Sequence, residues 1–212
     1  MRENIFSKVF LWMFIGLLVS FGTGWYVFNN ENMFYNVVDK WMIITIVELG
    51  LAFVFSLFIN KLSTLWAKIL YILYSFTTGL TFAVIFAAYE LSSIIYVFGI
   101  TSFLFLVLAI YGYKTKKDLT KLSTILFVGL IGIVIAGIVN IFLNNTMMDL
   151  IITVVGIVVF MGFIAYDMQK IKEIIYSIED PDKAGIIGAF ELYLDFINLF
   201  LKLLRLFGKS KD

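Results

Sequence analysis

The stretch ELYLDFINLFLKLLRLFG, residues 191–208, is mostly apolar and about as long as a membrane is thick. It nevertheless carries five polar side chains, those of Glu191, Asp195, Asn198, Lys202 and Arg205. On a helix with 3.6 residues per turn, these side chains fall within an arc of about 80°. A narrow polar stripe on an apolar segment predicts a membrane helix whose striped face turns inward, toward other helices or a water-filled path.

Two simpler interpretations of the stripe remain open. An amphipathic helix that lies flat on the membrane also has a polar stripe, although its polar arc is usually wider and richer in charge. Lys202 and Arg205 could also extend their side chains to the interface, whereas Asp195, near the middle of the segment, could not do so easily.

The composition places the whole chain in the membrane class. Hydrophobic residues make up 62% of the 212 residues, whereas a soluble domain is about 45–50% apolar. A net charge of +1 gives no basic patch for nucleic acid. The chain has no Cys and no His, which excludes disulfides, thiolate metal sites, Ser-His and Cys-His nucleophile pairs and HExxH metalloproteases.

Apolar runs of about 20 residues recur along the length of the chain. Backbone groups cannot stay unpaired in lipid, so these runs must be helices. We therefore predict an all-α polytopic membrane protein in which residues 1–212 form a single seven-helix transmembrane domain. The predicted helices cover residues 9–28, 41–60, 69–89, 94–113, 125–143, 147–166 and 186–207.

The connections between these runs are short. The breaks at 89–93 and 144–149 predict tight hairpins. The segment 168–185 predicts that the sixth helix continues past the membrane surface and then turns at EDPD, residues 179–182.

The distribution of Lys and Arg predicts the orientation. With the N-terminus in the cytoplasm, every Lys and Arg before residue 186 except Lys40 falls on the inner side. A seventh crossing places the basic residues after 200 on the outer side, whereas a segment that dips in and returns would keep them inside. We favour the crossing, because 22 helical residues span about 33 Å.

Asp167 is the candidate partner of Asp195. Pro181 lies 14 positions from each of the two, so a hairpin that turns near Pro181 brings both carboxylates to the same depth. The alternative is that Asp167 faces the lipid headgroups. Two neighbouring carboxylates cannot both ionise cheaply, so they would share a proton and act as a pH sensor or gate. Deprotonated, they would offer a weak calcium site, to which Asn198 and water could add oxygens.

Glu48, in IITIVELGLAF (residues 43–53), is the other acid that we predict to be buried in the membrane. An intramembrane carboxylate indicates an ion pathway or proton site, and the alternative is a structural hydrogen bond to a neighbouring helix. With Glu191 and Asn198 of the stripe, Glu48 completes our set of predicted pathway-lining or ion-contacting residues.

AYDMQKIK (165–172), followed by LYLDFINLFLKLLRLFG (192–208), closely resembles the last two helices of the Bax inhibitor family of seven-helix membrane proteins, particularly its bacterial members. YKTKKDLTKLS (113–123) is similar to the family's loop after helix four, and Glu48 matches its helix-two acid. The resemblance implies six helices around a central polar seventh helix. It also implies a pH-sensitive calcium leak, in which Asp167 and Asp195 are the proton sensor.

The chain departs from its bacterial relatives at one expected gate residue. In those relatives an arginine near the cytoplasmic end of helix two can bridge to the aspartates. Here the stretch reads FINKLS (58–63), so only Lys61 is available as a gate cation. Lysine lacks the bidentate fork of arginine, which predicts a looser gate or none.

We therefore predict a pH-sensitive calcium or cation leak channel in the bacterial plasma membrane, without enzymatic activity or a tightly bound cofactor. Calcium would be a permeant or sensed ion, and the partners would be membrane lipids, calcium, protons and other membrane proteins. One alternative is a non-conducting regulator that binds membrane proteins such as quality-control proteases, and another is a proton-coupled transporter. An intramembrane aspartyl protease fits poorly, because the sequence before Asp195 is LYLD rather than GxGD and no PAL motif follows.

Overall fold

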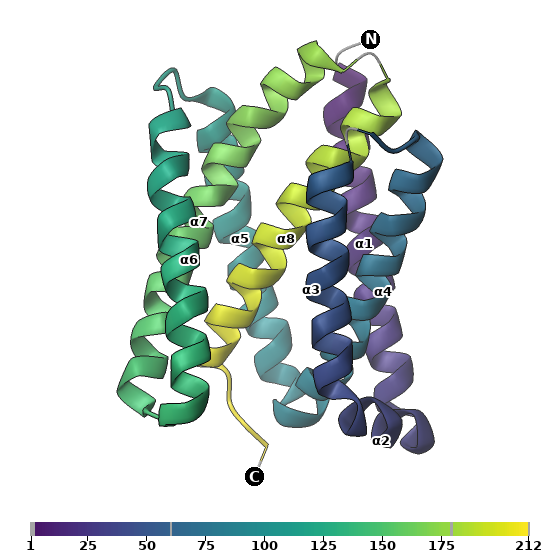
Figure 1. Cartoon of the computed structure of the whole chain (residues 1–212), viewed down its shortest axis with the longest axis vertical. Helices are drawn as coiled ribbons and strands as arrows, with labels where there is room; N and C mark the ends of the chain where they lie inside the picture. Colours follow the sequence, from purple (N-terminus) through teal and green to yellow (C-terminus); the bar gives the residue numbers. More distant parts are fainter. Residues whose placement is uncertain (1–2, 60, 179, 212) are drawn as a thin grey trace. The chain divides into compact units, whose positions relative to one another are not determined.

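The structure, a computed structural model, describes residues 3–59, 61–178 and 180–211. The described residues form eight helices and no strand (Figure 1). The helices are α1 (Glu3–Phe28), α2 (Glu31–Asp39), α3 (Trp41–Phe58), α4 (Thr64–Ala88), α5 (Leu91–Lys114), α6 (Thr120–Leu143), α7 (Thr146–Ser177) and α8 (Pro181–Phe207).

Seven of these helices, all except α2, are long and apolar enough to cross a membrane. The all-α, seven-span prediction is therefore confirmed. α7 continues to Ser177, so the sixth predicted helix does extend well beyond its predicted end at residue 166. Two predicted positions, residue 60 at the end of the second span and residue 179 in the turn, lie outside the described residues.

The nine-residue helix α2 has no counterpart among the predicted helices. Its start is fixed by Asn30, whose side-chain oxygen accepts a hydrogen bond from the backbone N–H of Met33 at 3.2 Å. Val37 is buried in a small apolar cluster with Val27 and Ala83. α2 is strongly amphipathic and too short to span a bilayer, which is typical of a helix at the membrane interface.

Both predicted hairpins are tight. Only Tyr89 and Glu90 separate α4 from α5, and only Asn144 and Asn145 separate α6 from α7. Asn144 adopts the left-handed conformation, with φ of 47°, which reverses the chain within two residues. The side-chain oxygen of Asn140 accepts a hydrogen bond from the backbone N–H of Asn145 at 3.0 Å and so secures the turn.

The chain divides into two compact units. The first comprises Met1–Leu91, Ile174–Tyr193 and Ser210–Asp212, and the second comprises Ser92–Glu173 and Leu194–Lys209. The continuous helix α8 contributes its first half to the first unit and its second half to the second. That residues 1–212 act as a single domain stays a prediction.

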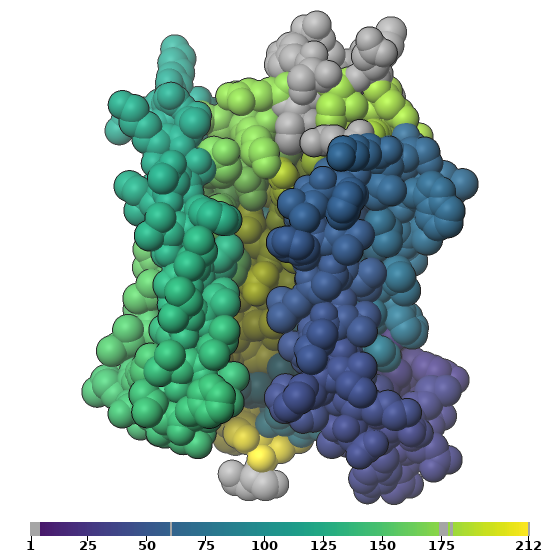
Figure 2. Space-filling model, in the orientation of Figure 1, coloured from purple at the N-terminus to yellow at the C-terminus, as the bar shows by residue number. Residues whose placement is uncertain are grey.

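In the first unit, α1 and α4 pack closely. A Cβ added to Gly24 of α1 would lie 2.7 Å from Cβ of Phe82, so only glycine allows this approach. Phe82 also stacks on Phe21 with ring centroids 4.7 Å apart. α3 packs on α4 as well, but its outward face is apolar and uncovered along its length (Figure 2). That face is the part of the first unit most suited to lipid.

Contacts at the two ends of α4 show where α8 begins and ends. At the start of α4, Thr64 donates a hydrogen bond to Asp180, which immediately precedes α8. At its end, the carbonyl of Ala88 accepts a hydrogen bond from the backbone N–H of Lys211, after α8, at 2.9 Å. A helix of 25 residues is about 37 Å long, more than the hydrocarbon core of a bilayer. α8 therefore begins and ends near opposite ends of α4, which favours a crossing over a segment that dips in and returns.

The second unit contains α6, most of α5 and α7, and the second half of α8. Leu126 and Ile133 of α6 pack with Ile152 and Val159 of α7 in one buried cluster. At the end of the spans, Gln169 of α7 holds the α5–α6 loop. Its side chain donates to one backbone carbonyl of that loop and accepts from one backbone N–H, both at 2.9 Å.

Candidate functional site

Asp167 of α7 and Asp195 of α8 are both buried, with exposed fractions of 8% and 5%. Both belong to the second unit, so the structure brings the two predicted sensor residues into the same compact part of the chain. Burial disfavours the ionised form of a carboxyl group unless a charge or hydrogen bond compensates. These two acids are therefore the best candidates for groups whose protonation matters.

Close packing against α5 holds the segment of α7 that carries Asp167. A Cβ added to Gly112 of α5 would lie closer than 3.0 Å to the backbone carbonyl of Ala165, a separation that real Cβ atoms essentially never show. Beside Asp195, Phe196 packs edge-on against Phe98 and Phe105 of α5, with centroid separations of 5.4 and 5.7 Å. Backbone contact and aromatic packing thus fix the positions of the two helix segments that carry these acids.

The rest of the α8 stripe continues along the second unit. The side-chain amide of Asn198 donates to the carbonyl of Leu194 at 2.8 Å. The stem of Lys202 lies over Gly156 of α7, where an added Cβ would meet its Cε at 3.0 Å. Arg205 forms an ion pair with Asp149 near the start of α7. These contacts with α7 support the prediction that the stripe faces other helices.

The remaining predicted pathway residues lie in the first unit. Glu48 of α3 is half-buried, and its two carboxylate oxygens accept hydrogen bonds from Thr78 (2.8 Å) and Thr81 (2.9 Å) of α4. Glu191 is half-buried on the first half of α8. Lys61 is exposed in the turn between α3 and α4. The structure therefore places Glu48, Glu191 and Lys61 in a different unit from Asp167, Asp195 and Asn198.

A buried hydroxyl cluster in the first unit was not among the predicted sites. The hydroxyl groups of Tyr193 and Ser20 are 2.5 Å apart, and Ser20 also donates to the carbonyl of Ser75 at 2.7 Å. Tyr71 and Tyr74 of α4 contact the ring of Tyr193 edge-on, at 5.8 and 5.9 Å. The signal was present in YILYSFTT (71–78), where Tyr71, Tyr74 and Ser75 recur at helical spacing on one face of α4.

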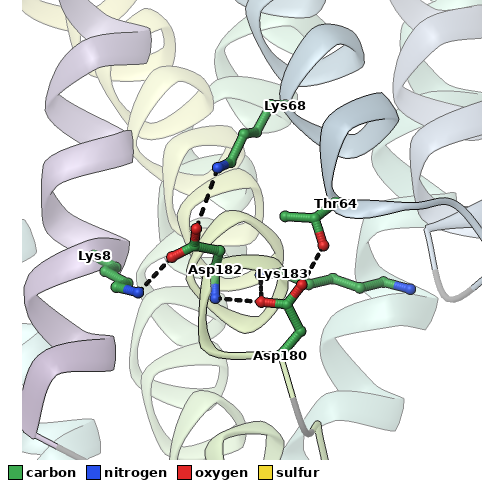
Figure 3. Close-up of polar contacts among 6 residues, drawn as sticks. All are labelled: Lys8, Thr64, Lys68, Asp180, Asp182 and Lys183. Atoms are coloured by element: carbon green, nitrogen blue, oxygen red, sulfur yellow. Dashed lines mark hydrogen bonds and ion pairs between the residues drawn. The ribbon is translucent and has the colours of Figure 1, made fainter. Parts of the chain in front are cut away.

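A charged cluster at the start of α8 was also missed (Figure 3). Asp182 forms ion pairs with Lys8 of α1 and with Lys68 of α4, the latter at 3.3 Å. We refer to Lys8, Lys68 and Asp182 as the α8 clamp. Sequence reasoning used Lys8 and Lys68 only in the orientation count and placed Asp182 only in the turn at EDPD, because nothing in the local sequence shows which lysine meets which acid.

Asp180 caps the start of α8. Its side chain accepts a hydrogen bond from Thr64 and two more from the backbone N–H groups of Asp182 (2.8 Å) and Lys183 (3.3 Å) (Figure 3). The hydroxyl of Thr64, followed by these amide donors, holds the pKa of Asp180 below its usual value. With Pro181 at the first helical position, the capping arrangement explains why α8 starts here.

A built metal centre is not found within the described part of the chain. Among the described residues, no three Asp, Glu, His or Cys side chains converge on one point. A tight calcium site needs six to eight oxygen ligands, so two carboxylates fit only a weak site that water completes. The weak calcium site at Asp167 and Asp195 stays a prediction.

Comparison with known proteins identifies the family to which the chain is similar. The family model described as "Inhibitor of apoptosis-promoting Bax1" matches residues 2–212. The Inner membrane protein YbhL of Escherichia coli is 41% identical, over 99% of this chain and 93% of that protein. An uncharacterized protein of Borreliella burgdorferi is 37% identical, over 100% and 94%. An uncharacterized membrane protein of Streptococcus pyogenes is 36% identical, over 85% and 80%.

Proposed function

The chain belongs to the Bax inhibitor family, and from that premise we propose that it is a pH-sensitive cation leak in which Asp167 and Asp195 sense protons. The observation that carries the proposal is the burial of both carboxyl groups in one compact unit, on two different membrane helices. Protonation at such a place changes how strongly the two helices are held, because a buried charge is costly without compensation.

The proposed gate follows from the chemistry of two carboxyl groups. With one shared proton, the pair holds α7 and α8 together by a hydrogen bond. Without the proton, two negative charges repel one another and present hard oxygen ligands to a cation such as calcium. The leak should therefore increase as the pH rises. Asn198 and water would supply further oxygens to a passing ion.

Glu48, Glu191 and Asn198 are the proposed contacts of the ion along its path. The hydrogen bonds from Thr78 and Thr81 show that the Glu48 carboxyl is oriented by α4. Lys61 remains the proposed gate cation. Its amine binds carboxylates as a point charge, so it would hold a gate less firmly than arginine.

The proposed setting is the bacterial plasma membrane with the N-terminus in the cytoplasm. The Escherichia coli relative is named an inner membrane protein, and the Lys and Arg distribution favours this orientation. We further propose that the chain is one seven-span domain, that it is not an enzyme and holds no tightly bound cofactor, and that its partners are lipids, calcium, protons and other membrane proteins.

Purified protein in liposomes that enclose a fluorescent calcium indicator tests the proposal. Calcium entry should be greater at pH 8 than at pH 6. Asp195→Asn and Asp167→Asn keep a hydrogen-bonding group but remove the charge, so each should reduce the flux at pH 8 and flatten its pH dependence. The matched control is Asp118→Asn, which changes an exposed acid in the α5–α6 loop and should leave the flux unchanged.

Three results would contradict the proposal in different ways. Calcium entry no faster than in protein-free liposomes at either pH would favour a non-conducting regulator of other membrane proteins. A pH-dependent flux that both asparagine variants retain would show a leak whose sensor lies elsewhere. Cleavage of an added membrane substrate, lost in both variants, would instead favour the aspartyl protease.

A further inference from the structure

A groove of about 560 Å³ opens on the surface of the first unit, between α1, α2 and α4. We propose that this groove binds one acyl chain of a bilayer phospholipid. Its volume lies within the range of about 300–1,000 Å³ that is usual for small-molecule sites. All the lining residues belong to the first unit, so the groove is a feature of one compact body.

One glycine that lines the groove, Gly22, is not used in helix packing. A Cβ added to Gly22 of α1 would meet nothing within 4 Å. Two residues further along, a Cβ at Gly24 would meet Phe82 of α4 at 2.7 Å. Gly24 therefore serves the contact between α1 and α4, while Gly22 leaves space beside that contact.

The groove is open to the exterior of the first unit. The lining side chains of Tyr26, Met33 and Phe76 are exposed by 62%, 43% and 46%. α1 and α4 both have the length and hydropathy of membrane spans, so the exposed side chain of Phe76, in the middle of α4, would meet bilayer hydrocarbon. An apolar hollow in that environment favours hydrocarbon, because water there would have few polar partners.

The short helix α2 gives the groove a polar end. Val37 anchors α2 to the apolar cluster, while Asn36 of the same helix lines the groove. Tyr26 lies in the last turn of α1, where aromatic residues with a polar tip suit the membrane interface. The side-chain amide of Asn36 donates one hydrogen bond to the carbonyl of Asn32 at 2.7 Å, and its second N–H, like the hydroxyl of Tyr26, can donate to ester and phosphate oxygens.

The polar end is what makes a bound lipid different from bulk lipid. Moving an acyl chain from the bilayer into an apolar groove gains little, because the lipid tails are as apolar as the groove. Retention therefore depends on shape and on hydrogen bonds at the headgroup end. A diacyl phospholipid can place one chain in the groove while its ester groups meet Asn36 and Tyr26.

Photolabelling in liposomes tests the site. The probe is a phospholipid with a photoreactive diazirine in one acyl chain, and labelled peptides are mapped by mass spectrometry. Labelling of the peptides that contain residues 22–36 and 76–80 should exceed labelling of α3 by at least fivefold. Gly22→Phe should fill the groove and reduce that labelling at least fivefold.

Matched variants separate loss of the site from loss of the fold. Gly50→Phe adds the same side chain at another glycine with open space around it, on the exposed helix α3, and should leave groove labelling unchanged. Asn36→Leu changes an exposed residue and should reduce the labelling by the phospholipid. Circular dichroism and gel filtration check that each variant is folded.

Equal labelling of α1, α3 and α4, or labelling that neither Gly22→Phe nor Asn36→Leu reduces, would mean annular lipid only and would overturn the proposal. Labelling of the groove by a photoreactive free fatty acid, but not by the phospholipid, would also overturn it, because the ligand would then be a single-chain lipid.

Discussion

Lys8 of α1 and Asp182 of α8 form an ion pair although 174 positions separate them in the chain. With Lys68 as the third member, this α8 clamp ties the start of the last helix to two helices from the first half of the chain. The side chains remain partly exposed, at 32% for Lys8 and 43% for Asp182. The clamp therefore sets the position of the start of α8 more than it stabilises the fold.

Asp182→Asn should lower the free energy of unfolding by about 1 kcal/mol, since partly exposed ion pairs contribute about 0.2–1 kcal/mol each. Denaturant unfolding in detergent measures the change. A double-mutant cycle with Lys8→Met isolates the pair, and strictly additive effects of the two substitutions would contradict a direct interaction. Raising the salt concentration should reduce the difference between wild type and variant.

Asp180 should make the stability depend on pH in the acid range. Its folded pKa is lowered below the unfolded value of about 3.9, so its contribution is present above that pH and is lost as the pH falls through the folded pKa. Asp180→Asn keeps a capping side chain but cannot titrate, so its unfolding free energy should fall less steeply below about pH 4 than that of wild type. Identical slopes for both proteins would show that the cap does not depend on charge.

Tyr193→Phe should lower the free energy of unfolding by about 0.5–1.5 kcal/mol, the net value of one buried hydrogen bond. The ring contacts with Tyr71 and Tyr74 are retained, and Ser20 keeps the carbonyl of Ser75 as an acceptor. The control is Tyr96→Phe on α5, where the side chain is 69% exposed and the loss of the hydroxyl should be neutral. Equal effects at both positions would argue against the hydroxyl cluster.

Two glycines of α5 should respond oppositely to alanine. Gly112→Ala forces α5 away from the carbonyl of Ala165, and overpacking of this kind costs about 1–3 kcal/mol. Gly99→Ala meets nothing within 4 Å and should stabilise α5 by about 0.5–1 kcal/mol through helix propensity. Thermal unfolding in detergent compares the two variants. A stabilised Gly112→Ala protein would mean that α5 and α7 can separate at this contact without a cost in stability.

Most of the fold could be predicted because membrane helices are read from long apolar runs, and each of the seven runs became a helix. The observed helix boundaries differ from the predicted ones where local capping extends a helix beyond its apolar run. α4 starts at Thr64 and not at residue 69, because the side chain of Ser63 accepts a hydrogen bond from the backbone of Trp66. α2 was not predicted, because an amphipathic helix of nine residues contains no long apolar run.

The candidate site was predicted in part, for a similar reason. Asp167 and Asp195 stand out in an apolar sequence, and counting from Pro181 places them at one depth, so their common burial could be anticipated. The α8 clamp and the hydroxyl cluster depend on helices distant in the chain meeting in space. Lys8 and Ser20 carry no local sign of their partners on α8.

The polar stripe of α8 also has a consequence for biosynthesis. Of the seven spans in the described residues, α8 has the lowest mean hydropathy, 1.6, and the largest buried share, 78%. Each Asp, Lys or Arg at the centre of a helix costs about 2.5–3.5 kcal/mol when the translocon releases that helix into lipid alone. α8 leaves the ribosome after the other six spans, so we expect helices that are already in the bilayer to assist its insertion.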